Sequence, residues 1–187
     1  DDVGLGSGDP GAHGSAFALT RKLAGHLAVD PDQIVLGNGS DEILGMLGRV
    51  LLRPGDEAVM PRPSFLMYEI TVRASGAEPV FVPLKGLAVD PEAVAGAVSE
   101  RTRIVFLCNP NNPTGSLLKK EQLAAFFAAL PGGIAVVLDE AYIEFVRDPA
   151  GASGLSPADN GRPLVVLRTF SKAYGLAGLR VGYGVMR

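Results

Sequence analysis

The chain has 187 residues and a mass of 19.4 kDa, the size of one domain of about 150 residues or slightly more. Its apolar fraction of 47% is enough for a buried core and excludes an intrinsically disordered protein. The 17 basic and 20 acidic side chains give a net charge of −3, so no basic surface favours a nucleic acid or an anionic membrane as a partner. We therefore expect a protein that acts on small molecules.

The sequence also lacks the usual marks of membrane insertion, secretion and metal binding. No apolar run approaches the roughly 18 residues of a membrane span, and the acidic start Asp1-Asp2 is unlike a signal peptide. The single cysteine, Cys108, has no partner for a disulfide or a zinc motif, and His13 and His26 lie in contexts typical of a loop and a helix face. We expect a cytoplasmic protein without a metal site. Because the chain has no initial Met and stops just after a strand-like run, we also expect a piece of a longer protein.

Short apolar runs alternate with segments of helical spacing along the chain. In chain order, the predictions are a helix at 16–27, a strand at 34–36, a helix at 41–52, a strand at 57–60, a helix at 64–75, a strand at 79–82, a helix at 91–99, a strand at 103–108, a helix at 120–130, and strands at 134–138, 164–168 and 181–185. Most strand runs do not alternate between apolar and polar residues, as expected when helices cover both faces of a sheet. The pattern predicts an α/β fold, a three-layer sandwich with a mostly parallel sheet.

Two predicted helices carry start signals. Asp90 precedes a proline and is expected to cap the helix at 91–99, and Ser40 is expected to cap the helix that Asp41 and Glu42 begin. Residues 1–14 and 148–162 are rich in Gly, Pro, Ser, Ala and Asp, so we predict a loose N-terminal arm and a surface loop there.

Polar clusters follow five of the predicted strands. They read GNGSDE at 37–42, PRPSF at 61–65, CNPNNPTG at 108–115, DEAYIEF at 139–145 and RTFSKAYGLAGLR at 168–180. Ligands of open α/β sheets bind outside the carboxyl ends of the strands, so these clusters form the candidate site.

In this order and spacing, the five clusters resemble the fold-type I enzymes that use pyridoxal 5'-phosphate, most closely the histidinol-phosphate aminotransferase family. The resemblance runs from about residue 9 to the end of the chain. It implies an incomplete cofactor-binding large domain over 15–187, an amino donor and a 2-oxo acid as substrates, and a homodimer. The implied reaction is the transamination of L-histidinol phosphate with 2-oxoglutarate in histidine biosynthesis.

The resemblance also implies the catalytic residues. Lys172 matches the lysine that bonds covalently to the cofactor aldehyde and then carries protons, and a partly buried site beside cations favours its neutral, nucleophilic form. Asp139 matches the carboxylate that keeps the pyridine nitrogen protonated, so that the ring withdraws electrons. Tyr142 matches the phenol that binds the cofactor's ring oxygen, together with Asn112.

The remaining implied contacts hold the cofactor's phosphate and ring. The phosphate ligands are expected to be backbone N–H groups at the helix start of Ser40 and Asp41, and the side chains of Thr169, Ser171 and Arg180. The carboxylates of Asp41 and Glu42 are expected to point away from the phosphate.

Phe65 takes the position where the family stacks an aromatic ring on the pyridine, often a tyrosine, which adds about 0.5–1.5 kcal/mol beyond burial. A core position beside Leu66 and Ile70 is an equally good interpretation of Phe65 taken alone. Tyr68 and Glu69 are predicted to lie on a helix face without a function.

Two features of the family are missing from the chain. The family's arm carries a tyrosine that reaches the partner subunit's phosphate, and residues 6–11 contain none. The smaller second domain and the substrate-binding arginine are expected beyond the end of the chain. An aromatic-amino-acid aminotransferase, a threonine-phosphate decarboxylase and an inactive piece that only binds the cofactor therefore stay open. A non-catalytic α/β module or a nucleotide-binding protein is a further alternative, although no P-loop or strand-linked GxGxxG motif supports it.

Overall fold

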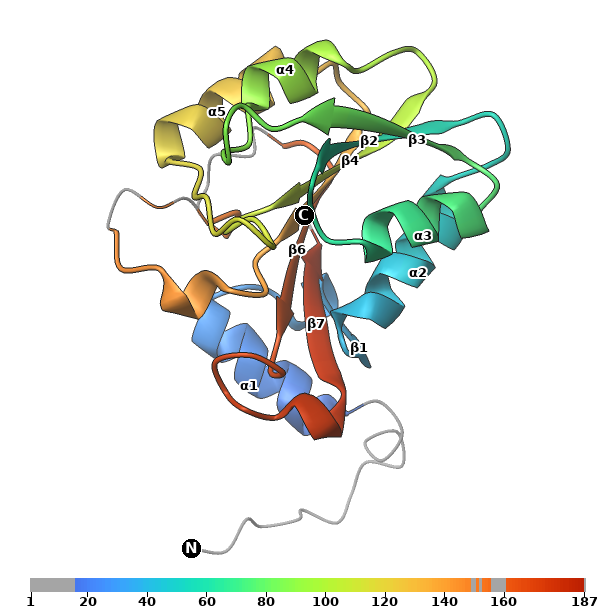
Figure 1. The fold of residues 1–187 in the computed structure, drawn as a ribbon. Helices are drawn as coiled ribbons and strands as arrows, with labels where there is room; N and C mark the ends of the chain where they lie inside the picture. Colours follow the sequence, from blue (N-terminus) through green and yellow to red (C-terminus); the bar gives the residue numbers. More distant parts are fainter. Residues whose placement is uncertain (1–15, 149–150, 152, 156–160, 187) are drawn as a thin grey trace, which may run out of the picture.

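The computed structural model describes residues 16–148, 151, 153–155 and 161–186 (Figure 1). One mixed sheet of seven strands, in the order β1-β7-β6-β5-β4-β2-β3, forms its middle layer. The strands are β1 (Ile34–Asn38), β2 (Glu57–Arg62), β3 (Glu78–Pro83), β4 (Thr102–Cys108), β5 (Ala135–Asp139), β6 (Leu164–Thr169) and β7 (Val181–Met186). The predicted arm at 1–14, with His13, and part of the predicted loop at 148–162 lie outside the described residues.

The sheet is mostly parallel, as predicted. Strands β3, β2, β4, β5 and β6 run parallel to one another, whereas β7 pairs antiparallel with both β6 and β1. All five residues of β5 are buried, which explains the continuous apolar run in the sequence. Because β7 runs against its neighbours, its amino end lies at the same edge of the sheet as the carboxyl ends of the other strands.

Five α-helices cover both faces of the sheet in the described part of the chain: α1 (Phe17–Leu27), α2 (Ser40–Leu51), α3 (Met67–Ala74), α4 (Pro91–Gly96) and α5 (Lys120–Ala129). Figure 1 shows α2 and α3 side by side on one face, and α1, α4 and α5 on the other. Each face has its own core. One is built around Phe126 and Val136, and the other around Ile43 and Phe106. This is the three-layer arrangement that the sequence predicts.

Helix boundaries differ from the predictions where a side chain has another partner. The α3 helix begins at Met67 and not at residue 64, because the Ser64 hydroxyl donates a hydrogen bond of 2.9 Å to Asn111 Oδ1. The α4 helix ends at Gly96 and not at residue 99, because the Ser99 hydroxyl donates to Glu57 Oε2 at 2.5 Å. The predicted cap at Asp90 is confirmed, since its carboxylate accepts from the backbone N–H groups of Glu92 and Ala93.

The predicted cap at Ser40 is wrong. The N-cap of α2 is Gly39, with φ of +72°, and Ser40 is already the first helical residue, without a capping hydrogen bond. A positive φ is readily adopted only by glycine, so the chain turns at Gly39 before the helix begins. The Ser40 backbone and side chain are therefore placed beside the carboxyl edge of the sheet.

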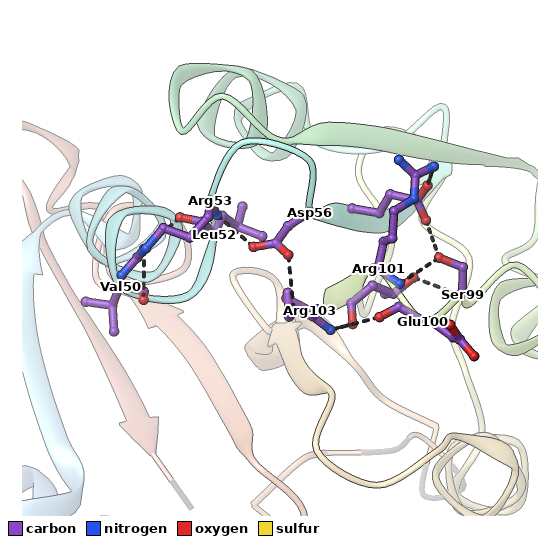
Figure 2. Close-up of polar contacts among 10 residues, drawn as sticks. Val50, Leu52, Arg53, Asp56, Ser99, Glu100, Arg101 and Arg103 are labelled. Carbon is purple, nitrogen blue, oxygen red and sulfur yellow. Dashed lines mark hydrogen bonds and ion pairs between the residues drawn. The ribbon is translucent and has the colours of Figure 1, made fainter.

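Charged side chains close the opposite, amino edge of the sheet (Figure 2). The buried carboxylate of Glu57 pairs with the Arg101 guanidinium and accepts from Ser99. Next to it, Asp56 pairs with Arg103 at 3.1 Å. These contacts tie the starts of β2 and β4 together at the edge opposite the predicted site.

None of the helices in the described ranges combines the length and hydropathy that are needed to cross a membrane.

Candidate active site

One pocket lies where the carboxyl ends of β1, β2, β4, β5 and β6 meet the amino end of β7. It is lined by Gly39, Ser40, Asp41, Phe65, Cys108, Asn112, Asp139, Ala141, Tyr142, Thr169, Ser171, Lys172 and Arg180. The structure thus brings all ten predicted site residues together, although they come from all five polar clusters of the sequence. Parallel strands explain this, because their carboxyl ends reach the same edge.

Asp139 is the buried charge of the pocket. It ends β5 with an exposed fraction of 2%, and its Oδ1 accepts a hydrogen bond of 3.1 Å from the backbone N–H of Ala141. Burial raises the pKa of this carboxyl from 3.8 to about 6, although the hydrogen bonds that it accepts act in the opposite direction. A cationic partner in the pocket would stabilise its ionised form.

Tyr68 is the residue of this site that the sequence interpretation missed. Its side chain is completely buried, not on an open helix face, and its phenol donates a hydrogen bond of 2.8 Å to Asp139 Oδ2. Its ring stacks on Phe106, with centroids 4.9 Å apart and planes within 9° of parallel. The spacing of Tyr68, Thr71 and Val72, all buried, follows one helix face and is the signal that could have placed Tyr68 inside. Tyr68 does lie on a helix face, as predicted, but that face is the buried one, and its contact with Asp139 was not foreseen.

The start of α2 forms one end of the pocket, close to Arg180. The backbone N–H of Gly39 donates to the Arg180 carbonyl at 2.8 Å, and a Cβ at Gly39 would lie 2.5 Å from the Arg180 guanidinium. A Cβ at Gly182 would overlap the backbone of Ser40. Two glycines thus let the first turn of α2 approach β7 and Arg180 closely. The N–H groups of a first helical turn have no partner within the helix and bear a partial positive charge.

A buried hydroxyl without a partner also lines the pocket. Within the described ranges, Ser171 Oγ is the one buried side-chain nitrogen or oxygen that has no hydrogen-bond partner. The nearby hydroxyl of Thr169 accepts from the Ser171 backbone N–H at 3.1 Å. A buried hydroxyl without a partner costs free energy, so Ser171 together with Arg180 indicates a place for a polar ligand.

The two acidic residues at the start of α2 behave differently. Glu42 turns back, and its Oε2 accepts a hydrogen bond of 2.7 Å from the Asn38 backbone, so it points away from the pocket as expected. Asp41 does not, because it lines the pocket and its Oδ2 lies 3.5 Å from Arg180 Nη2. The expectation for Asp41 is therefore wrong in this structure. The Arg180 guanidinium draws the carboxylate towards the pocket.

Lys172 lies across the pocket from α2. Its Nζ is 5.4 Å from the centre of the Tyr142 ring, within the range of a cation–π contact. The side chain of Lys172 is exposed, which contradicts the expectation of a partly buried lysine.

Phe65 and Asn112 also line the pocket. Phe65 is half-buried just before α3 and packs against the core that contains Ile43 and Phe106. Leu66 and Ile70 are 63% and 45% exposed, so the core interpretation of Phe65 is correct in part, without these two neighbours. It meets the Tyr68 ring edge to face at 5.6 Å. Asn112 is half-buried in the loop after β4 and lines the pocket beside Tyr142.

Behind the pocket, a buried ion pair supports the end of β5. Glu140 has an exposed fraction of 0%, and its Oε2 accepts hydrogen bonds of 3.0 and 2.8 Å from the Arg168 guanidinium. The same carboxylate accepts from the Gly154 backbone at 2.6 Å and from the Ser153 hydroxyl at 3.1 Å. This network joins the residue after Asp139 to β6 and to the loop that follows β5.

No group of three His, Cys, Asp or Glu side chains that could hold a metal ion occurs in the described part of the chain. The chemistry of the pocket is instead that of a hydroxyl, a guanidinium, an amine and a buried carboxylate.

The three-layer fold, with its polar pocket at the carboxyl edge, is that of the fold-type I enzymes. The family described as "Aminotransferase class I and II" matches residues 6–187, and the chain belongs to that family.

Several relatives of known name support this membership. A histidinol-phosphate aminotransferase of Carboxydothermus hydrogenoformans is 51% identical over 175 residues, which are 91% of this chain and 48% of the relative. An aromatic amino acid aminotransferase of Cutibacterium acnes is 45% identical over 172 residues, 91% of this chain and 49% of the relative. The solved structure of a histidinol-phosphate aminotransferase from Sinorhizobium meliloti, in complex with pyridoxal-5'-phosphate, matches with a TM-score of 0.83 and 36% identity. That match covers 90% of this chain and 46% of the other. The chain thus spans about half the length of the relatives that it matches.

Proposed function

We propose that the protein to which this chain belongs is a pyridoxal-phosphate-dependent aminotransferase, and that the pocket described above holds the cofactor. The observation that carries the proposal is that one pocket is lined by two features that need a ligand. One is the buried hydroxyl of Ser171, which has no partner, together with Arg180 and the first turn of α2, and the other is the buried carboxylate of Asp139.

These two features suit the two charged parts of such a cofactor. A phosphate would accept hydrogen bonds from Ser171 Oγ, the Arg180 guanidinium and the backbone N–H groups that begin α2, which would supply the partner that Ser171 lacks. In this arrangement the phosphate competes with Asp41 for Arg180. Asp139 would face a pyridinium, and the opposite charge would offset the cost of burying the carboxylate.

The other pocket residues suit the uncharged parts of the ring. Phe65 offers the face or edge of an aromatic ring, and Tyr142 and Asn112 offer hydrogen-bond donors for a ring oxygen. Lys172 Nζ is the primary amine that can bond to an aldehyde. Each of these roles is what the resemblance of the sequence implies, and the shared pocket supports them.

Three residues of the chain would then have separate roles in the reaction. When bound, pyridoxal phosphate would supply an electron sink for the reaction. Asp139 would hold negative charge for the ring nitrogen and favour its protonated form. Lys172 Nζ would accept a proton from the substrate as a general base and give it back as a general acid. The centre of the Tyr142 ring lies 5.4 Å from Lys172 Nζ, so Tyr142 would orient the amine.

For the substrates, we propose L-histidinol phosphate as the amino donor and 2-oxoglutarate as the acceptor, in a cytoplasmic homodimer. The supporting observation is the higher identity to the histidinol-phosphate aminotransferase of Carboxydothermus hydrogenoformans, 51%, than to the aromatic amino acid aminotransferase of Cutibacterium acnes, 45%. Because the second relative is nearly as similar, transamination of aromatic amino acids is the second candidate. The small second domain that we expect beyond this chain would carry the groups that select between them.

The test uses the full-length protein, loaded with pyridoxal phosphate and followed by visible absorption. L-histidinol phosphate, L-phenylalanine and O-phospho-L-threonine are added separately, each with and without 2-oxoglutarate. We expect L-histidinol phosphate to convert the cofactor to its amino form fastest, and 2-oxoglutarate to reverse the change. Faster conversion by L-phenylalanine would replace the proposed substrate with the second candidate. Release of carbon dioxide from O-phospho-L-threonine would make the protein a decarboxylase, and failure to bind the cofactor would refute the proposal as a whole.

A further inference from the structure

We propose that Tyr68 is a positioning residue for Asp139, whose phenol fixes the carboxylate in the orientation that faces the pocket. This inference rests on the proposed function, because it gives Tyr68 a part in the same site. Sequence reasoning assigned Tyr68 no function, and its contact with Asp139 joins α3 to the end of β5, two elements far apart in the chain.

The phenol of Tyr68 has little freedom to move. The side chain is fully buried, and its ring is held between the stacked ring of Phe106 at 4.9 Å and the edge contact with Phe65 at 5.6 Å. Burial raises the pKa of Tyr68 well above 10, so the hydroxyl keeps its proton and acts as a donor at neutral pH. The hydrogen bond of 2.8 Å to Asp139 Oδ2 is therefore anchored on the tyrosine side.

The carboxylate of Asp139 is held at both oxygens. Oδ2 accepts from Tyr68, and Oδ1 accepts from the Ala141 backbone N–H at 3.1 Å. Two donors that approach from different elements fix the rotation of the carboxylate about its bond to Cβ. Each oxygen of an ionised carboxylate can accept a second hydrogen bond, so both remain able to meet a donor in the pocket.

Tyr68 also acts on the charge of Asp139. Burial raises the pKa of Asp139 to about 6, and the hydrogen bond from Tyr68 is the largest contribution in the opposite direction. The other titratable or charged groups around Asp139 are Asp41 on α2, Cys108 on β4, Glu140 next in the chain, and Tyr142, Lys172 and Arg180 across the pocket. Of these, Asp41 and Glu140 raise the pKa further. Without the phenol, a larger fraction of Asp139 would be protonated near pH 7.

Cys108 does not take over this role. Its thiol donates to the Pro110 carbonyl at 3.2 Å, and burial raises its pKa to about 12. A neutral thiol is a weak donor, so it cannot replace a phenol that is already directed at Oδ2.

The same side chain connects two walls of the pocket. Its hydroxyl holds the Asp139 carboxylate, and its ring meets the ring of Phe65 edge to face. Phe65 lines the pocket just before α3. The first turn of α3 therefore aligns the carboxylate and the aromatic ring relative to one another. Replacing Tyr68 with phenylalanine would keep the ring contacts and remove the hydroxyl, with its hydrogen bond to the carboxylate and its contact with Cys108.

The test compares Tyr68→Phe with the unchanged full-length protein. In the cofactor-free protein, infrared titration follows the protonated carboxyl band of Asp139, which is identified by its loss in Asp139→Asn. In the loaded protein, kcat and KM are measured across pH. Tyr183→Phe is the matched control, since it removes the hydroxyl of another buried tyrosine that does not contact Asp139.

We expect Tyr68→Phe to raise the pKa of Asp139 and to lower kcat about 10-fold or more, in line with the loss of a hydrogen bond to a charged group, while KM changes little. Tyr183→Phe should leave the pKa of Asp139 unchanged. In the Asp139→Asn background, adding Tyr68→Phe should reduce kcat by less than 2-fold, because Tyr68 acts through Asp139.

Three other outcomes would contradict the role of Tyr68 or the proposed function. If Tyr68→Phe leaves both the pKa of Asp139 and kcat unchanged in a protein that binds the cofactor, the role of Tyr68 is refuted and the proposed function stands. An equal loss of kcat with or without Asp139 would mean that Tyr68 acts by another route, which also overturns the inference. A protein that never binds the cofactor would refute the proposed function, while the titration of the cofactor-free protein would still decide whether Tyr68 controls Asp139.

Discussion

Lys172 Nζ lies 5.4 Å from the centre of the Tyr142 ring, so the turn after β6 and the turn after β5 meet across one pocket. Both turns begin at the carboxyl end of a parallel strand. The sheet therefore brings an amine next to a phenol and, beneath them, the buried carboxylate of Asp139. Four predictions follow from this arrangement and from the contacts that support it.

Lys172→Ala should abolish covalent attachment of pyridoxal phosphate and leave the protein folded. The side chain is exposed and supports no core contact, so its truncation removes the amine alone. The visible absorption of the loaded protein and its unfolding temperature measure the two effects. Lys120→Ala, at the exposed start of α5, is the control and should keep the full absorption. An unchanged absorption band in Lys172→Ala would contradict the assignment.

Asp139→Asn should retain cofactor binding but slow transamination on the order of 100-fold, which corresponds to about 2.7 kcal/mol of activation free energy. A neutral amide has almost the shape of the carboxylate, yet it cannot keep a ring nitrogen protonated. Cofactor affinity and kcat are measured on the same preparation. Turnover near that of the unchanged protein would rule out the electrostatic role of Asp139.

The stability of the cofactor-free protein should depend on the protonation of Asp139. Its pKa is about 6 in the folded state against an ordinary value of 3.8, so the folded state binds the proton more tightly. This tighter proton binding adds to the free energy of unfolding. The contribution is fully present below about pH 4 and is lost as the pH rises to about 6. Relative to Asp139→Asn, the free energy of unfolding should fall on the order of 3 kcal/mol between about pH 4 and 7. Denaturant titrations at each pH measure it, and a difference that stays constant with pH would refute the prediction.

Arg168→Met should destabilise the protein by about 3–5 kcal/mol, because it leaves the buried carboxylate of Glu140 without its cation. The control is Arg73→Met, which removes an exposed pair of 2.9 Å with Glu69 on α3 and should cost about 0.5 kcal/mol. Denaturant unfolding of both variants measures the contrast. Equal losses would mean that the Glu140 carboxylate finds another partner when Arg168 is removed.

The parts of the fold that depend on local patterns could be predicted from the sequence. Continuous apolar runs such as the one at 134–138 marked the buried parallel strands, and the Asp90-Pro91 pair marked a helix start. The residues of the candidate site could also be predicted. Ligands of open α/β sheets bind outside the carboxyl ends of the strands, so the prediction needs only the strands and the polar residues that follow them. Family membership, expected from the five clusters, is confirmed by the match over 6–187.

The parts that depend on contacts between distant segments could not be predicted. The role of Tyr68 depends on Asp139, and the start of α3 depends on Asn111, which holds the Ser64 hydroxyl. The position of Asp41 likewise depends on Arg180, which precedes another strand. In each case the sequence shows the residue but not its partner, because the partner is brought near only by the folded sheet.

The most direct test of the central claim is to locate the cofactor on the chain. The full-length protein is incubated with pyridoxal phosphate, reduced with borohydride to make the link permanent, digested, and mapped by mass spectrometry. The account predicts one stoichiometric label, on Lys172, which is lost in Lys172→Ala and retained in Lys120→Ala. A label spread over several surface lysines, or placed on one lysine outside the pocket, would contradict it.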